Sequence, residues 1–309
     1  YNFIVMGWVI NAMASVVSVM LNMDKWTAVW LCVSIAVVYA ILSGFWGVVI
    51  TDIVQFFIAM FGSIALAIIA LNHVGGMDTL LQKLSSLLGT DIIHENTLKF
   101  IPPIPDNSIG SLSFWESPFS KFLIFITVMW WSHHGTDGGG YIIQRMSSAK
   151  NEKHALLATL WFNLAHYAVR VWPWIIVGVV SIVMFPVIPD SYSELGTKAG
   201  YPLVMNMLLG PGMKGILIVS FLAAFMSTID THLNWGASYI INDIYKRFFK
   251  PNESEKHYVI VSKVITVILM ILAAFTALKM QSISKAWAFI FSMGAGIGLV
   301  LILRWFWWR

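Results

Sequence analysis

Residues 130–145 read WWSHHGTDGGGYIIQR and place three consecutive glycines inside an otherwise apolar part of the chain. Consecutive glycines destabilise a helix and leave backbone carbonyl and amide groups without helical partners. Inside a membrane, such a break is tolerated only where it is buried in protein or lines a water-filled cavity. We therefore predict a broken membrane helix at Gly138, Gly139 and Gly140.

The composition of the whole chain supports a membrane location for this segment. The 309 residues have a mean hydropathy of +0.77, and only 11% of them are charged. Soluble domains carry about 25% charged residues, because their surface faces water. The alternating pattern of membrane β-strands is absent, so we predict an all-α membrane protein. At about 20 residues per crossing, it would have about eight transmembrane helices. The apolar runs fall at 1–22, 28–48, 52–72, 119–144, 155–185, 213–243, 258–280 and 285–306.

The distribution of Lys and Arg predicts the topology. Basic residues crowd the short loops after residues 144 and 245, whereas the long connection 73–118 is richer in acids. Because basic loops stay on the cytoplasmic side, 73–118 is predicted to be an extracellular loop. We expect residues 1–309 to form a single transmembrane domain of a multi-pass protein of the plasma (inner) membrane. The basic residues do not gather on one soluble face, so no nucleic-acid partner is expected.

A Thr-Asp pair begins the third apolar run. Asp52 and Gln55 lie one helical turn apart and therefore share a face. Thr51 or Asp52 could cap the start of the helix by accepting hydrogen bonds from free backbone N–H groups. Alternatively, Asp52 could lie on an ion path, because a carboxylate within a membrane is costly unless it has a function. Both interpretations remain open.

Polar side chains form a stripe along one face of the sixth apolar run, 213–243. Ser227, Thr231, Asn234 and Ser238 follow the spacing i, i+4, i+7, i+11 of one helix face. Hydroxyl and carbonyl oxygens are suitable ligands for a hard cation. Such residues also commonly bond their own helix or a neighbouring one. Asp230 beside the stripe favours the cation interpretation, because packing alone seldom requires a carboxylate.

Other polar residues allow further interpretations. His133, His134 and Asp137 could suggest a metal site, but a broken helix beside a substrate path is favoured, because no second cluster supplies ligands. In the fifth run, Asn163, His166 and Arg170 share a face. They could line a solute cavity, or Arg170 could pair with Asp137. No nucleophile–base pair or metal cluster has catalytic spacing, so an enzyme is not expected.

Three ordered motifs resemble the sodium:solute symporter family. Residues 44–55, GFWGVVITDIVQ, are similar to its first signature, and 223–228, AAFMST, with 242–247, NDIYKR, are similar to its second. Gln144-Arg145 matches the cytoplasmic end of the family's broken helix. The resemblance implies a leucine-transporter-type architecture of two inverted five-helix repeats. This chain would supply core helices three to ten, as a fragment that lacks the first core helices and a C-terminal part.

The resemblance also implies site residues. A backbone carbonyl and two hydroxyls of the eighth core helix would bind Na⁺, and these positions match Ala224, Ser227 and Thr228. Carbonyls of the first core helix, which is missing here, would complete the site. The resemblance also implies that Asp52 acts in sodium exit or in a second sodium site. The expected substrate path comprises Asp137, Gly138, Gly139, Gly140, Asn163, His166 and Asn234.

The implied function is sodium-coupled symport of a small organic solute by alternating access. Sugar-transporting relatives carry Asn-Gln shortly before Gln-Arg, whereas this chain has Gly139-Gly140 and an additional Asp137. A sugar, an organic anion and an amino acid therefore all remain open as the solute. The alternative is that the chain is the membrane input domain of a sensor kinase that resembles such a transporter.

Overall fold

The computed structural model describes residues 2–42, 45–90, 99–106, 109–129, 139–280, 282–294 and 297–307. These residues form helices and connections, with no strand among them. The first half contains α1 (Asn2–Leu21), α2 (Lys25–Leu42), α3 (Phe45–Val74), α4 (Met77–Ser86), α5 (Leu112–Glu116), α6 (Pro118–Ile124), η1 (Phe125–Met129), α8 (Gly139–Ser147) and α9 (Glu152–Asn163). The second half contains η2 (Leu164–Val169), α10 (Val171–Met184), η3 (Asp190–Ala199), α11 (Gly200–Leu208), α12 (Pro211–Tyr239), η4 (Ile240–Phe249), α13 (Glu255–Lys279), α14 (Ile283–Gly294) and α15 (Ile297–Phe306).

Several of these helices are long and apolar enough to cross a membrane. Among the described residues, five pass this test: Asn2–Leu21, Ile50–Val74, Glu152–Met184, Pro211–Phe249 and Glu255–Lys279. The bent pair α14 and α15 makes a sixth if both belong to one span. The two remaining predicted runs hold shorter apolar helices, Lys25–Ile41 and Pro118–Met129. Over its described residues, each of the eight apolar runs is therefore helical, and five of the runs contain a continuous helical stretch of spanning length there. The chain is a multi-pass membrane protein.

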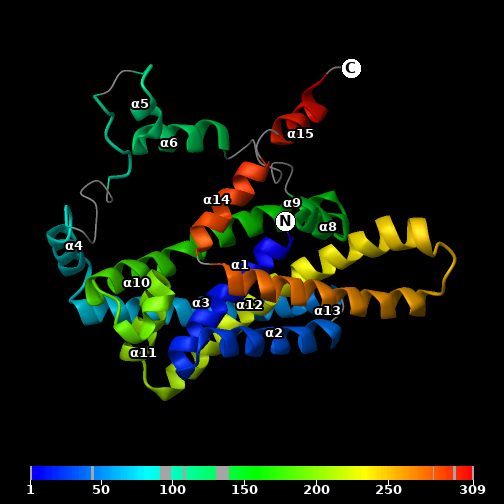
Figure 1. Cartoon of the computed structure of the whole chain (residues 1–309), viewed down its shortest axis with the longest axis horizontal. Helices are drawn as coiled ribbons and strands as arrows, with labels where there is room; N and C mark the ends of the chain where they lie inside the picture. The colour runs from blue at the N-terminus through cyan, green and yellow to red at the C-terminus, as the bar shows by residue number, and fades with distance from the viewer. Residues whose placement is uncertain are drawn as a thin grey trace.

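The predicted extracellular loop 73–118 is not without structure. It contains the end of α3 together with α4 and α5, and Figure 1 shows α5 and α6 lying away from the main bundle. Its position relative to the membrane stays a prediction.

Helix α12 joins the two larger parts of the core. One hydrophobic cluster packs α1, α2, α12 and α13 around buried residues such as Ile10, Val29 and Met270. A second cluster packs α3, α10, α11 and α12 around residues such as Leu66 and Leu217. In Figure 1, α12 accordingly runs through the middle of the bundle. Polar residues of α12 therefore lie between packed helices, where they can serve a site.

A buried amide ties α1 to the end of α13. Asn11 is 1% exposed, and its Nδ2 donates to the carbonyls of Ala277 and Met280 at 3.0 Å and 2.7 Å. Its Oδ1 accepts a hydrogen bond of 3.2 Å from Nζ of Lys198 in η3. The carbonyl of Ala277 also accepts from the N–H of Met280, and the carbonyl of Met280 also accepts from Nζ of Lys25, both at 3.3 Å. The amide of Asn11 is therefore a second donor to each carbonyl, and it fixes the end of α13 to α1.

We expect Asn11→Ala to lower the thermal stability of the full-length protein. The change removes one of the two donors to each carbonyl and the acceptor for Lys198, and each such hydrogen bond contributes about 0.5–1.5 kcal/mol. The midpoint of thermal unfolding in detergent measures the effect. Asn206→Ala is the matched control, because Asn206 is exposed and accepts only a surface hydrogen bond from Lys214. Equal midpoints for both variants would contradict the structural role of Asn11.

Candidate functional site

The candidate site lies where α3 packs against α12. Ser220 of α12 donates to the carbonyl of Ile58 in α3 at 2.8 Å. Gly62 of α3 lies directly against Ser220, and the hydroxyl of Ser227 lies beside the carboxylate of Asp52. Residue numbers rise on α3 as they fall on α12, so the two helices are antiparallel.

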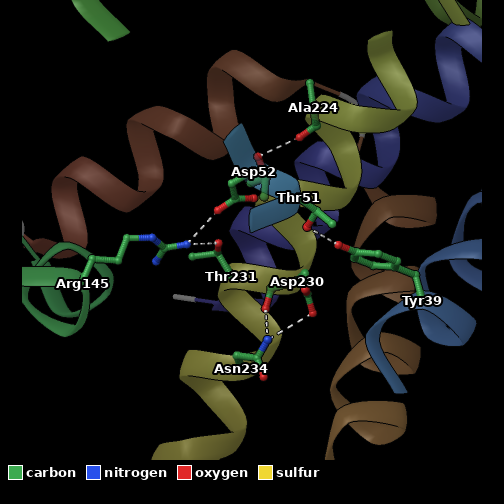
Figure 2. Close-up of polar contacts among 9 residues, drawn as sticks. Tyr39, Thr51, Asp52, Arg145, Ala224, Asp230, Thr231 and Asn234 are labelled. Carbon is green, nitrogen blue, oxygen red and sulfur yellow. Dashed lines mark hydrogen bonds and ion pairs between the residues drawn. The ribbon is translucent and has the colours of Figure 1, made fainter. Parts of the chain in front are cut away.

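Asp52 forms an ion pair with an arginine that follows the predicted helix break. Nη2 of Arg145 in α8 donates to Oδ2 of Asp52 at 3.1 Å and to Oγ1 of Thr231 in α12 at 2.8 Å. The side chains of Arg145 and Asp52 are 31% and 24% exposed, so the pair is partly buried. Figure 2 shows Arg145 reaching Asp52 and Thr231 from one side. One guanidinium thus links α3, α8 and α12.

The capping interpretation of Asp52 is wrong. Helix α3 already begins at Phe45, so Thr51 and Asp52 lie in its second turn, where the backbone N–H groups have helical partners. The hydroxyl of Thr51 instead forms a hydrogen bond of 2.7 Å with the Tyr39 hydroxyl of α2. The carboxylate of Asp52 is therefore directed into a contact between helices.

The three predicted sodium ligands lie on the part of α12 beside Asp52. Oγ1 of Thr228 donates to the carbonyl of Ala224 at 3.1 Å, which holds these two oxygens next to each other. A bond from a hydroxyl to the carbonyl four residues earlier is also the ordinary behaviour of threonine in a helix. Ser227 lies beside Asp52. The assignment of these residues as sodium ligands stays a prediction.

The polar stripe of α12 divides into two parts. Ser227 and Thr231 face α3 and α8, as described above. Asn234 instead donates to the backbone and side-chain oxygens of Asp230, both at 3.1 Å, and Ser238 donates to the carbonyl of Trp235 at 2.8 Å. The second half of the stripe therefore bonds its own helix, as the packing interpretation predicts.

Steric constraints explain why two of the three consecutive positions are occupied by glycine. Gly139 has φ of 71°, in the left-handed region that favours glycine. A Cβ on Gly140 would lie 2.5 Å from Nε1 of Trp235, so α8 can approach α12 only without a side chain there. Gly138, His133, His134 and Asp137 lie outside the described residues. Among the described residues, no cluster of His, Cys, Asp and Glu could hold a metal ion.

Two adjoining cavities lie next to this close approach. Their volumes are about 270 Å³ and 330 Å³, and both are lined by Gln144, Ser238 and Asn242. Asn234 lines the first cavity, and Gly140 lines the second. Two members of the predicted substrate path thus border cavities that Gln144 also lines.

The predicted path residues of the fifth apolar run bond within their own segment. Nδ2 of Asn163 donates to the carbonyl of Thr159 at 2.9 Å, and His166 lies 3.3 Å from Nη2 of Arg170. The guanidinium of Arg170 also lies over the Trp174 ring. The alternative pairing of Arg170 with Asp137 involves a residue outside the described ranges. A role of Asn163 and His166 in a solute path stays a prediction.

Sequence reasoning did not assign roles to Arg145 and Trp235. In the sequence, Arg145 counts only as a basic residue of the loop after residue 144 and as part of the Gln-Arg motif, whereas the structure places it in α8. A charge that soon follows a helix break in an apolar run was a usable signal. No local pattern indicates that Trp235 must lie against Gly140.

The fold is a leucine-transporter-type helical bundle. It is similar to the structure described as "Substrate-bound outward-open state of a Na+-coupled sialic acid symporter reveals a novel Na+-site". The TM-score is 0.62 at 20% sequence identity, over 90% of this chain and 57% of that chain. The profile of the sodium:solute symporter family matches residues 1–309, so the chain belongs to this family.

Named relatives transport different solutes. The chain is 26% identical over 277 residues to sodium/glucose cotransporter 4 of Danio rerio, covering 83% of this chain and 40% of that protein. It is 24% identical over 296 residues to the sodium/proline symporter of Escherichia coli (strain K12), covering 93% of this chain and 53% of that protein. The chain thus spans about half the length of the curated relatives it matches.

Proposed function

We propose that the protein is a secondary active transporter that couples the entry of a small organic solute to the entry of Na⁺. The observation that carries this proposal is the link from Arg145 to Asp52 and Thr231 beside the predicted sodium ligands. Membership of the family and the names of the relatives support it. They give no support to the alternative of a sensor-kinase input domain, or to an enzyme.

In the proposed cycle, Na⁺ binds the carbonyl of Ala224 and the hydroxyls of Ser227 and Thr228. Backbone carbonyls of a first core helix complete its coordination. Binding stabilises an outward-facing state that accepts the solute near the helix break. Movement of one helix bundle then opens the inner side, where Asp52 receives the leaving ion.

The energy of one sodium ion is sufficient for nutrient uptake. Moving one charge through a potential of 100 mV gains roughly 2.3 kcal/mol. A tenfold concentration gradient adds about 1.4 kcal/mol. Together these terms sustain an accumulation of a neutral solute by roughly a few hundredfold.

The solute is proposed to be a sugar, an organic anion or an amino acid, taken up across the plasma (inner) membrane. Its path is proposed to pass Asp137, Gly138, Gly139, Gly140, Asn163, His166 and Asn234. The two cavities lined by Gly140 and Asn234 support the inner part of this path.

Ser227→Ala and Thr228→Ala should each raise the sodium concentration needed for half-maximal uptake by the full-length protein. Each change removes one oxygen ligand from the ion, so we expect a rise of about tenfold, the value of one hydrogen bond to a charged group. Radiolabelled solute uptake at varied Na⁺ measures it.

Ser34→Ala is the matched control, because the Ser34 hydroxyl donates to the carbonyl of Trp30 on an exposed part of α2. Like Thr228, it bonds the carbonyl four residues earlier. If all three variants keep the sodium dependence of the wild type, the site assignment is wrong.

A further inference from the structure

The hairpin formed by η4 and α13 carries two exposed aromatic rings at its tip. Phe248 and Phe249, the last residues of η4, are 70% and 69% exposed. Ile244 is also exposed, and its spacing of four and five residues from the two rings places all three side chains on one side of a π-helix. In Figure 1, the yellow end of η4 and the orange start of α13 extend beyond the rest of the bundle. An apolar face therefore lies at the tip of this hairpin.

The tip is held in a fixed shape by contacts between the two helices. The Tyr258 hydroxyl of α13 donates to the carbonyl of Lys250 at 2.6 Å and accepts from the N–H of Glu253 at 3.1 Å. The hydroxyl of Tyr245 in η4 forms a hydrogen bond of 2.8 Å with Nε2 of His257 in α13. Because the turn is bonded to α13 in this way, the exposed rings belong to an ordered surface.

Positive charge surrounds the apolar face. The tip, residues 246–257, contains four basic side chains against two acidic ones: Lys246, Arg247, Lys250 and Lys256, with Glu253 and Glu255. Both glutamates form ion pairs at the surface, one with Lys250 at 3.1 Å and the other with Lys246 at 3.7 Å. Within the part of the chain that the structure describes, no ion pair joins Arg247 or Lys256 to a carboxylate. The guanidinium of Arg247 lies over the Phe248 ring, 5.5 Å from its centroid.

The neighbouring apolar run places the tip at the membrane surface. The run of α13 begins at Tyr258, one helical turn after Glu255, and Glu255 pairs with Lys246 of η4. At about 1.5 Å per residue, Phe248 and Phe249 lie roughly 8–9 Å beyond the start of that run. The headgroup layer is about 5–8 Å thick on each side of the hydrocarbon. Helical side chains lean toward the N-terminus of their helix, which for η4 is back toward the membrane, so the rings reach the headgroups.

We propose that the tip of the η4–α13 hairpin is a docking surface for negatively charged lipid headgroups. Phe248 and Phe249 insert among the headgroups, while Arg247 and Lys256 bind their phosphate groups. A guanidinium can donate two parallel hydrogen bonds to one phosphate. Basic and aromatic side chains together bind an anionic membrane surface, and that surface is present at the depth of the tip. This interaction is independent of which ion and solute the protein transports.

The test is the thermal stability of the purified full-length protein in detergent, titrated with anionic phosphatidylglycerol or with zwitterionic phosphatidylcholine. A ligand that binds only the folded state raises the unfolding temperature as its concentration increases. The wild type should be stabilised more by phosphatidylglycerol. In the double variant Arg247→Gln, Lys256→Gln, the concentration for half of the effect should rise about twenty-five-fold, because each basic residue near an anionic surface contributes about fivefold in affinity.

Two further double variants separate the charge from the fold. Arg247→Lys, Lys256→Arg keeps both charges and should stay close to the wild type. Phe248→Ser, Phe249→Ser keeps the charges but removes the rings, and it should also require more phosphatidylglycerol. Lys150→Gln, Lys153→Gln is the matched control, because it removes two exposed charges from the connection before α9.

The result that supports the docking surface is a larger shift for both tip variants, without charge or without rings, than for the control. Equal shifts in the control and in Arg247→Gln, Lys256→Gln would overturn it, since the lipid would then respond only to total charge. Equal stabilisation of the wild type by the two lipids would also overturn it. An unchanged phosphatidylglycerol response in Phe248→Ser, Phe249→Ser would contradict the insertion of the rings and point to another partner for them.

Discussion

Asp52→Asn should lower the maximum rate of sodium-coupled uptake by the full-length protein by about ten- to a hundredfold. The asparagine cannot balance the charge of Arg145, so the link between α3, α8 and α12 is weakened. Removing one partner of a buried pair costs about 3–5 kcal/mol, and this partly exposed pair should lose less, about 2 kcal/mol. Solute uptake at saturating Na⁺ measures the maximum rate.

The effect on turnover should exceed the effect on solute binding. Asp52 contacts Arg145 and lies beside Ser227, and neither contact belongs to the cavities lined by Gly140 and Asn234. The solute concentration for half-maximal uptake should therefore change by less than the maximum rate. Asp78→Asn on the exposed part of α4 is the control for loss of a carboxylate.

The double variant Asp52→Asn, Arg145→Gln isolates the ion pair. If the pair itself is the functional element, the second change should cause little further loss, because its partner is already absent. Independent, additive losses would show that Asp52 acts without Arg145. Transient kinetics identical to the wild type in Asp52→Asn would rule out the proposed role in sodium exit.

Gly140→Ala should abolish most of the transport activity of the full-length protein. The added Cβ would lie 2.5–2.7 Å from three atoms of the Trp235 indole, so α8 or the ring must move. Overpacking of this kind costs about 1–3 kcal/mol. Because Arg145 lies in the same short helix, moving α8 also shifts the guanidinium away from Asp52 and Thr231. Solute uptake and cell-surface amount, measured together, separate lost function from lost folding.

A second change should restore activity if the steric explanation is right. Trp235→Leu removes the ring atoms nearest to Gly140, so the combined variant should recover part of the uptake lost in Gly140→Ala. Gly178→Ala in α10 is the control, because its added Cβ would meet no described atom within 4 Å apart from its chain neighbours and the backbone of its own helix. A Gly140→Ala variant as active as Gly178→Ala would disprove the close approach of α8 to α12.

The fold class was predictable from the sequence because the membrane imposes its own constraints. Long apolar runs with few charges must form helices, since hydrocarbon offers no partner for backbone groups. The glycines at 138–140 similarly predict a break in a helix, and the positive φ of Gly139 agrees with such a break.

The residue at which α3 begins was less predictable. The residues around Thr51 and Asp52 have the chemistry of a helix cap, but apolar residues before them continue the helix back to Phe45.

The sequence by itself determined the class of the chain, its apolar helices and which polar residues are unusual in a membrane. It also placed Asp52 with Gln55 on one face, and Ser227 with Thr231 on another, because helical periodicity depends only on spacing. Only the tertiary structure decided that these two faces meet, that Arg145 reaches Asp52 and Thr231, and that Trp235 requires glycine at 140. The physical reason is that contacts between helices depend on their register and distance, which no local pattern of residues encodes.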